Sequence, residues 1–176
     1  MSDRTFRLER LSRSHDRASF SCGVEALDRY LRQYARQDRD RKAVGVFVLL
    51  DETTTLIAGY YTLSSEIVEL KNLPPDFVEK LPRYSRLGAT LIGRLAIDTR
   101  YQGQGIGRRL LLDALRRAFE RSDEIGAVAV IVDAKDNAAR AFYERFGFAR
   151  FTDDEYRLFL PTLSISLLLP ELTQPT

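Results

Sequence analysis

A glycine-rich turn in the second half of the chain separates a predicted strand from a predicted helix. The strand is the apolar run 90–97, and the helix is 106–121, where Leu and Ala recur at the spacing of one helix face. Glycine stands at alternate positions, 103, 105 and 107. A strand that turns directly into a helix leaves N–H groups unpaired, and glycine lets an anion approach them. The turn is a candidate anion site, although such glycines also allow a helix to pack tightly on a sheet.

Two other phosphate-binding motifs do not fit this turn. A dinucleotide-binding fold needs three glycines spaced G-x-G-x-x-G and an acidic residue after the next strand. Asp133 does end the next predicted strand, but the spacing here is G-x-G-x-G and the turn lies late in the chain. The P-loop sequence G-x-x-x-x-G-K-S/T does not occur, so a P-loop is excluded.

The other predicted elements give a mixed, layered fold. Residues 24–42 carry the one-sided apolar pattern of an amphipathic helix. The remaining predictions are strands at 6–8, 45–50, 56–64, 127–132 and 156–160, a surface excursion at 70–86 with a short helix near 76–80, and a helix at 137–146. Because strands and helices alternate in the second half, we expect an α/β or α+β fold with a parallel crossover at the glycine turn.

Composition limits the class of protein. A chain of 176 residues, 44% hydrophobic and 30% charged, without a repeat or linker, predicts one globular domain over residues 1–176. Its net charge of +2 gives no general attraction to nucleic acid or membranes, so any basic site must be local. The lone Cys22, the polar first ten residues and the lack of a stretch of about 20 apolar residues predict a soluble, cytoplasmic protein.

Two segments together resemble the GNAT superfamily of acetyltransferases. Residues 102–107, QGQGIG, match its Q/R-x-x-G-x-G/A signature, and residues 93–98, GRLAID, stand in the preceding strand. Residues 137–148, NAARAFYERFGF, match N-x-x-A-x-x-F-Y-x-x-x-G-F. The resemblance covers about residues 20–161 and implies the GNAT fold, with a mixed sheet of six to seven strands flanked by helices. It also implies acetyl-CoA as acetyl donor and no metal.

Within the superfamily the sequence is most similar to the acetyltransferase toxins of toxin–antitoxin pairs. The shared features are Cys22-Gly23, Leu27-Asp28 and the segments 59–63, 93–96 and 157–160. Such toxins acetylate the α-amine of aminoacyl-tRNA and are silenced by a ribbon-helix-helix antitoxin. The resemblance implies both for this chain, and it also implies a homodimer. The apolar tail 163–169 is expected to pack either on the domain or on a second subunit.

The resemblance also assigns site residues by position. Main-chain N–H groups of 95–97 would hold the pantetheine and the thioester carbonyl, and those of 102–108 the pyrophosphate. Asn137 would bond the pantetheine arm, and Tyr143 would protonate the CoA sulfur. The residues expected to bind the cofactor are Leu95, Ala96, Ile97, Gln102, Gly103, Gln104, Gly105, Ile106, Gly107, Arg108, Asn137 and Tyr143. A phenol with a pKa of about 10 is protonated at neutral pH, but Tyr143 also fits an interior aromatic.

The sequence shows no general base. His15, the single histidine, is expected at the surface, and Glu66 and Asp98, near strand ends, are expected to be solvated. Cys22 has no paired histidine and is expected to be a packed small side chain, not a nucleophile. Direct acetyl transfer, with the amine deprotonated through water, is therefore preferred.

The acceptor amine is left open by the residues themselves. Arg suits phosphate contacts, and two groups are candidates for RNA binding, although the interleaved acids of the first group favour an ordinary solvated face. They are Arg29, Arg32, Arg36 and Arg39 on the first predicted helix, and Arg83 and Arg86 beside Tyr84. The alternatives to a tRNA-directed toxin are a small-amine or protein acetyltransferase with an acidic pocket, and a CoA-binding regulatory module without turnover.

Overall fold

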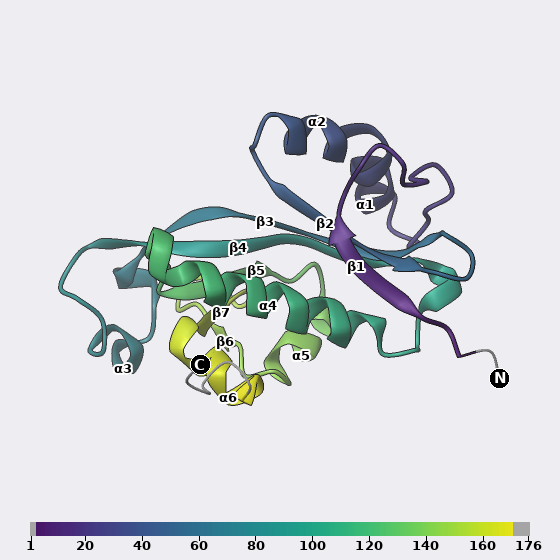
Figure 1. Cartoon of the computed structure of the whole chain (residues 1–176). Coiled ribbons are helices and arrows are strands. Elements are labelled where there is room, and N and C mark those ends of the chain that lie inside the picture. The colour runs from purple at the N-terminus through teal and green to yellow at the C-terminus, as the bar shows by residue number, and fades with distance from the viewer. Residues whose placement is uncertain (1–2, 171–176) are drawn as a thin grey trace. The chain divides into compact units, whose positions relative to one another are not determined.

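The computed structural model describes residues 3–170 of the chain (Figure 1). Their contacts form two compact units, the first made of residues up to 64 with 93–113, the second of 65–92 with residues from 114 on. Three elements run through both units: strands β3 (Ile57–Glu69) and β4 (Arg86–Ile97), and helix α4 (Ile106–Ile125). The expectation of a single domain over 1–176 stays a prediction.

The sheet is mixed, as predicted. Within the described residues it has seven strands in the order β1-β2-β3-β4-β5-β7-β6. The strands not yet given are β1 (Phe6–Arg10), β2 (Gly45–Asp51), β5 (Ala129–Asp133), β6 (Ala149–Arg150) and β7 (Arg157–Pro161). The pairs β1–β2, β2–β3, β5–β7 and β6–β7 are antiparallel, whereas β4 and β5 are parallel. The parallel pair is joined through α4, where the glycine turn predicted a crossover.

The ladder between β4 and β5 is short. It runs from Thr90 opposite Val130 to Ile92 opposite Val132, while β4 continues to Ile97. Residues 93–97 therefore lie beyond the part of β4 that pairs with β5. This stretch includes the main chain of residues 95–97, from which the sequence predicts hydrogen bonds to a thioester.

In the first unit, the predicted helix 24–42 is three consecutive pieces. They are α1 (Glu25–Arg29), a π-helical turn η1 (Tyr30–Tyr34) and α2 (Ala35–Asp40). Leu31 and Ala35 are fully buried in a cluster with Val48 of β2 and Tyr60 of β3. A π-turn adds a residue to the repeat and rotates the helix face. Tyr34, predicted on the apolar face, is instead 50% exposed.

The second unit has its own apolar cluster. Helix α3 (Pro75–Val78) lies in the predicted excursion after a short 3-10 turn η2 (Leu70–Asn72), and Phe77 stacks on Phe159 of β7 at 5.0 Å. Helix α5 (Asn137–Glu144) begins after Asp136, whose side chain caps it. The two-residue strand β6 was not predicted, because so short a segment carries no periodicity.

The apolar tail folds as a 3-10 turn η4 (Thr162–Ser164) and helix α6 (Ile165–Leu168). Ile165 and Leu169 are buried, whereas Leu163 and Leu167 are 84% and 81% exposed. The tail therefore buries part of its apolar surface within this chain. No helix in the stretch 3–170 is long and apolar enough to cross a membrane.

His15 is buried, so its predicted place at the surface is wrong. Its Nε2 lies 2.6 Å from Glu9 Oε1, and its Nδ1 accepts a hydrogen bond from Ser12 N at 2.9 Å. Both ring nitrogens are thus engaged in tying the segment after β1. Cys22 is buried, as predicted.

Candidate cofactor-binding and active site

The glycine turn connects a 3-10 turn η3 (Thr99–Tyr101) to the start of α4. Gly103 and Gly105 both have φ of +77°, a conformation that side chains disfavour. A Cβ atom at either position would meet nothing within 4 Å among the described residues. Close packing therefore does not explain these two glycines. They hold a left-handed backbone that other residues disfavour, and they leave open space in front of it.

Gly59 of β3 shows what a packing glycine looks like in the same unit. A Cβ atom there would lie 2.8 Å from Leu110 Cδ1 and 2.9 Å from the carbonyl oxygen of Ala96. Gly59 thus lets α4 and β4 approach β3. Tight packing therefore explains Gly59, whereas the open space at Gly103 and Gly105 fits an anion site.

The N-terminus of α4 has the donors that an anion needs. The first helical bond runs from Arg109 N to Gly105 O at 3.2 Å, so Gly105 is the N-cap residue. The N–H groups of Ile106, Gly107 and Arg108 therefore precede the ladder, and a glycine cap has no side chain to accept from them. Together with the positive end of the helix dipole, they form a site suited to a phosphate or pyrophosphate.

Side chains of the turn hold its shape. Gln102 Nε2 donates to the carbonyl oxygens of Cys22 and Ile97, both at 3.0 Å, and Gln104 Nε2 donates to Arg100 O at 3.2 Å. Since these amides are engaged with protein carbonyls, any contact of Gln102 or Gln104 with an anion falls to the main chain. Tyr101 adds a bond from its hydroxyl to Asp51 at 2.8 Å.

Asp98, expected to be solvated, is fully buried at the end of β4. Its carboxylate accepts from Arg100 Nε and Nη2, both at 2.8 Å, from Arg100 N at 2.9 Å, and from Ser21 N at 3.0 Å. Burial alone would raise the pKa of Asp98, but these hydrogen bonds outweigh it and lower the pKa below its usual range. The charged Asp98 side chain therefore holds the start of the turn in place. Both of its carboxylate oxygens already accept hydrogen bonds, so neither is free to act as a base.

Asn137 and Tyr143 lie on α5 of the second unit. Asn137 Oδ1 accepts a hydrogen bond from the Tyr156 hydroxyl at 2.7 Å. Tyr143 is buried, with its ring 5.2 Å from Phe142 and 5.5 Å from Phe148, centre to centre. Burial raises the pKa of Tyr143, so its phenol is protonated at neutral pH.

The other predicted cofactor residues, 95–97 and 102–108, lie in the first unit. The hydrogen bond from Gln102 Nε2 to the carbonyl oxygen of Ile97 links these two segments directly.

Sequence reasoning missed one arginine beside the predicted thioester strand. The Arg94 guanidinium lies 3.5 Å from the centre of the Tyr30 ring, and the Tyr30 hydroxyl donates to Asp38 at 3.0 Å. The pairing joins β4 to the π-helical turn, so no local pattern could have indicated it.

The arginines of the first helical segment divide into two groups. Arg32 and Arg39 donate to the carbonyl oxygens of Phe20 and Leu11, whereas, among the described residues, Arg36 makes only a 3.9 Å ion pair with Asp40, and Arg29 is exposed. In the excursion, Arg83, Tyr84 and Arg86 are all exposed.

The comparisons with known proteins agree with this geometry. Residues 8–148 match the model of the Acetyltransferase (GNAT) family, so the chain belongs to that family of acetyltransferases. It is 30% identical to "Probable toxin TacT" of Sinorhizobium fredii, over 88% of this chain and 90% of the relative. It is 34% identical to a "tRNA-acetylating toxin" of Mycobacterium tuberculosis, over 86% and 89% respectively.

Solved structures extend the likeness. AtaT in complex with acetyl-methionyl-tRNAfMet is 32% identical, has a TM-score of 0.87 and covers 94% of this chain and 99% of its own. AtaTR bound with acetyl-CoA is 32% identical, with a TM-score of 0.81 over 93% and 98%. An AtaT variant bound to the C-terminus of the antitoxin AtaR is 30% identical, with a TM-score of 0.80 over 96% and 99%.

Replacing Asp98 with Asn should lower the free energy of unfolding by about 1.5–3 kcal/mol at pH 7, because hydrogen bonds to a buried charge are lost. The folded-state pKa lies below the unfolded value of about 3.9, so this contribution is complete above pH 4 and disappears as the pH falls through the folded pKa. Urea unfolding at several pH values measures it. The exposed Asp153→Asn control should change stability by less than about 0.5 kcal/mol. A deficit that stays constant down to pH 3 would contradict the assignment.

Gly105→Glu should abolish acetyl-CoA binding, because a side chain and a negative charge would enter the space in front of the α4 N-terminus. Gly126→Glu is a matched control, since Gly126 also has positive φ (+64°) and nothing within 4 Å of a Cβ atom. Both variants should lose about 1–2 kcal/mol of stability from backbone strain, but only Gly105→Glu should lose binding in calorimetry. Unchanged affinity of Gly105→Glu would rule out the turn as the cofactor site.

Proposed function

We propose that this enzyme transfers the acetyl group of acetyl-CoA to the α-amine of an aminoacyl-tRNA, as the toxin of a toxin–antitoxin pair. The observation that carries the proposal is a likeness to a tRNA-acetylating toxin that spans most of both chains. The structural likeness to AtaT holding acetyl-methionyl-tRNAfMet supports the same acceptor class.

The cofactor contacts are proposed from the family match and the local geometry. The open turn and the first turn of α4 bind the pyrophosphate through the main chain of Gln102, Gly103, Gln104, Gly105, Ile106, Gly107 and Arg108. The part of β4 that continues past β5 binds the pantetheine and the thioester carbonyl through Leu95, Ala96 and Ile97. Asn137, whose orientation is fixed by Tyr156, bonds the pantetheine arm.

The reaction is a direct transfer. The neutral amine attacks the thioester carbonyl carbon, and main-chain N–H groups stabilise the oxyanion that forms. The carbon–sulfur bond then breaks, the new carbon–nitrogen bond becomes an amide, and the amine releases its proton to water. Tyr143 gives its phenolic proton to the departing thiolate and regains one from solvent. The phenol is protonated at neutral pH even at its ordinary pKa of about 10, so a proton is available when the thiolate forms.

The side chains considered as bases are all engaged elsewhere. His15 is bonded to Glu9 and Ser12, Asp98 to Arg100 and Ser21, and Glu66 forms a 2.8 Å ion pair with Arg157. Deprotonation of the amine through water is therefore part of the proposal.

The partners follow from the same proposal. A ribbon-helix-helix antitoxin would bind and silence the enzyme, since AtaT is bound by the C-terminus of its antitoxin AtaR. The acceptor is a component of translation, so the enzyme would act in the cytoplasm. A homodimer remains part of the proposal.

One observation favours a second acceptor class, a cationic small amine. The second unit contains a pocket of about 320 Å³ whose lining includes Glu66, Glu69, Asp153 and Asp154. Its single cation, Arg157, pairs with Glu66. This is the acidic lining that a polyamine site would need, and it would repel RNA.

Tyr143→Phe should lower kcat by about 10²–10⁴-fold while leaving acetyl-CoA affinity unchanged, because only the proton donor is removed. The ring and its aromatic contacts remain, so a packing role alone predicts no change in kcat. Steady-state kinetics and calorimetry measure the two quantities. Tyr84→Phe, which removes a hydroxyl from an exposed tyrosine, is the control and should match the wild type.

Incubation with radiolabelled acetyl-CoA tests the acceptor. Total aminoacylated tRNA, uncharged tRNA and a polyamine panel are offered separately, and we expect label on aminoacylated tRNA alone. Label on polyamines instead would assign the enzyme to small-amine acetylation. Acetyl-CoA binding without label on any acceptor would favour a regulatory module without turnover.

A further inference from the structure

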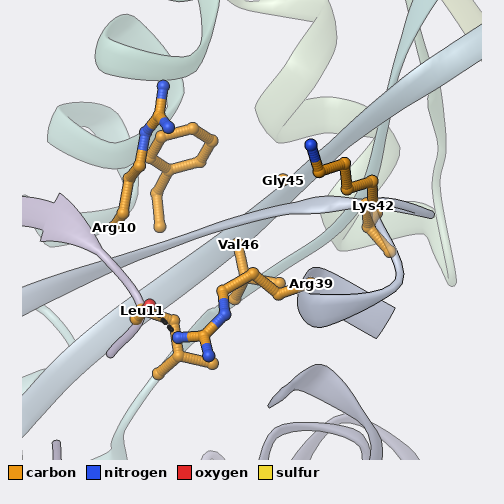
Figure 2. Close-up of a pocket in the computed structure, with 8 residues that line it drawn as sticks. Arg10, Leu11, Arg39, Lys42, Gly45 and Val46 are labelled. Atoms are coloured by element: carbon orange, nitrogen blue, oxygen red, sulfur yellow. Dashed lines mark hydrogen bonds between the residues drawn. The ribbon is translucent and has the colours of Figure 1, made fainter. Parts of the chain in front are cut away.

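A pocket outside the proposed acetyl-transfer site lies where β1 ends and β2 begins (Figure 2). It has a volume of about 620 Å³. Its cations are Arg10 at the end of β1, Arg39 of α2 and Lys42 just after α2. Apolar residues complete the lining, among them Leu11, Val46 and Phe47, whose ring is buried and stacks on Tyr61 at 5.0 Å.

These three cations have different tasks. Arg39 is committed to the fold, because it donates to the carbonyl oxygen of Leu11 and to Asp40; Figure 2 shows the first of these bonds. Arg10 and Lys42 are exposed, and their side chains make no ion pair or hydrogen bond within residues 3–170. Two full positive charges are therefore available at the pocket.

The backbone at Lys42 is a second, independent observation. Lys42 N donates to Arg39 O at 3.0 Å, and Ala43 N donates to Asp38 O at 2.9 Å, which is the pattern of a Schellman helix end. Lys42 occupies the left-handed position of that motif, with φ of 59°, where glycine is the favoured residue. A lysine there is held in a disfavoured conformation, as is common for residues at binding sites.

A second basic pocket also lies beside α2. It has a volume of about 350 Å³ and is lined by Arg17, Arg32, Gln33, Arg36, Gln37, Asp40 and Arg41. Arg17 and Arg32 are bonded to main-chain carbonyls, so they are structural. Within the described residues, Arg36 has only the 3.9 Å ion pair with Asp40; Arg41 makes no ion pair, but its Nη1 and Nη2 donate to Gln37 Oε1 at 2.8 and 2.9 Å.

Charge is concentrated in this region. Residues 10–42 contain nine Arg and Lys and five Asp and Glu, a net charge of +4, whereas the whole chain carries +2. Asp40 is the only acid that lines either pocket, and its hydrogen bond from Arg39 lowers its pKa. Asp40 is therefore ionised at neutral pH, but the Arg and Lys residues that line the two pockets outnumber it, which leaves a local excess of positive charge around α2.

We propose that Arg10 and Lys42, continued by Arg36 and Arg41, bind the phosphodiester backbone of the RNA acceptor. The inference rests on the proposed function and adds a contact surface to it. Cations in two pockets along one helix suit a chain of phosphates better than a single anion, and Arg suits bidentate phosphate contacts. The apolar lining of the larger pocket suits a ribose or base beside its phosphate.

Binding of deacylated tRNA, followed by fluorescence anisotropy at increasing salt, tests this surface. The double variant Arg10→Gln/Lys42→Gln should bind roughly 10- to 50-fold more weakly at 0.1 M salt. The slope of log K against log salt should fall by about two, one for each lost phosphate contact. Arg36→Gln/Arg41→Gln should behave in the same way. With aminoacylated tRNA, KM should rise and kcat should stay unchanged, as should acetyl-CoA affinity.

The matched control is Lys71→Gln/Arg121→Gln, which removes two exposed charges from the second unit. It should weaken RNA binding by no more than about twofold. Equal losses in the control and the Arg10/Lys42 variant would overturn the proposal, because they would reflect net charge alone.

Lys42→Gly separates binding from folding. Glycine relieves the left-handed strain, so the Tm should stay equal or rise while RNA affinity falls. A fall in Tm with unchanged RNA affinity would make Lys42 structural and overturn its assignment. A poly-glutamate peptide tests the competing ligand: loss of peptide binding in these variants, with RNA binding intact, would assign the surface to an acidic protein segment instead.

The outcomes also separate this inference from the proposed function. If the wild type acetylates no aminoacyl-tRNA but its RNA binding depends on Arg10 and Lys42, the proposed function fails and the surface stands. If it acetylates aminoacyl-tRNA and all four substitutions leave KM and RNA affinity unchanged, the surface fails and the function stands.

Discussion

The buried carboxylate of Asp98 is the interaction on which the candidate cofactor turn depends. It joins the end of β4 to Arg100 and to Ser21, and the main chain around it adds bonds from Asp98 N to Ala58 O and from Thr99 N to Ser21 O. A buried charge is tolerable only where donors surround it. The segment before Gln102 is therefore fixed in one conformation, and the glycines that follow start from a rigid base.

That rigidity explains how a turn made of flexible residues can be a site. Gly103 and Gly105 have unusual backbone freedom in the unfolded chain, and ordering them costs entropy. The amides of Gln102 and Gln104 close the turn onto neighbouring carbonyls, so much of this cost falls on folding, before any ligand arrives. An anion then meets N–H groups that already point outward, and pre-ordering of this kind favours affinity.

The sequence predicted what local patterns can encode. Strand, glycine turn and helix were predicted because their periodicity and glycine spacing lie within one continuous stretch, residues 90–121, and the sheet is mixed, as predicted. The errors concern partners that are distant or hidden. Asp98 was expected to be solvated because nothing local shows its bond to Ser21, 77 residues away. Tyr34 was placed on the apolar face because no pattern signals a π-turn.

The arginines show most clearly why composition could not settle the acceptor. Arg17, Arg32 and Arg39 are spent on main-chain carbonyls, so their charges stabilise loops and helix ends. Arg10 and Lys42 each add the same single positive charge to the total, but their side chains are exposed. The net charge of the chain therefore does not distinguish cations that stabilise the fold from cations that are exposed and available to a ligand. The hydrogen bond from Arg39 of α2 to the carbonyl oxygen of Leu11 also ties the end of α2 to the end of β1, so a structural arginine joins the two segments that carry Lys42 and Arg10.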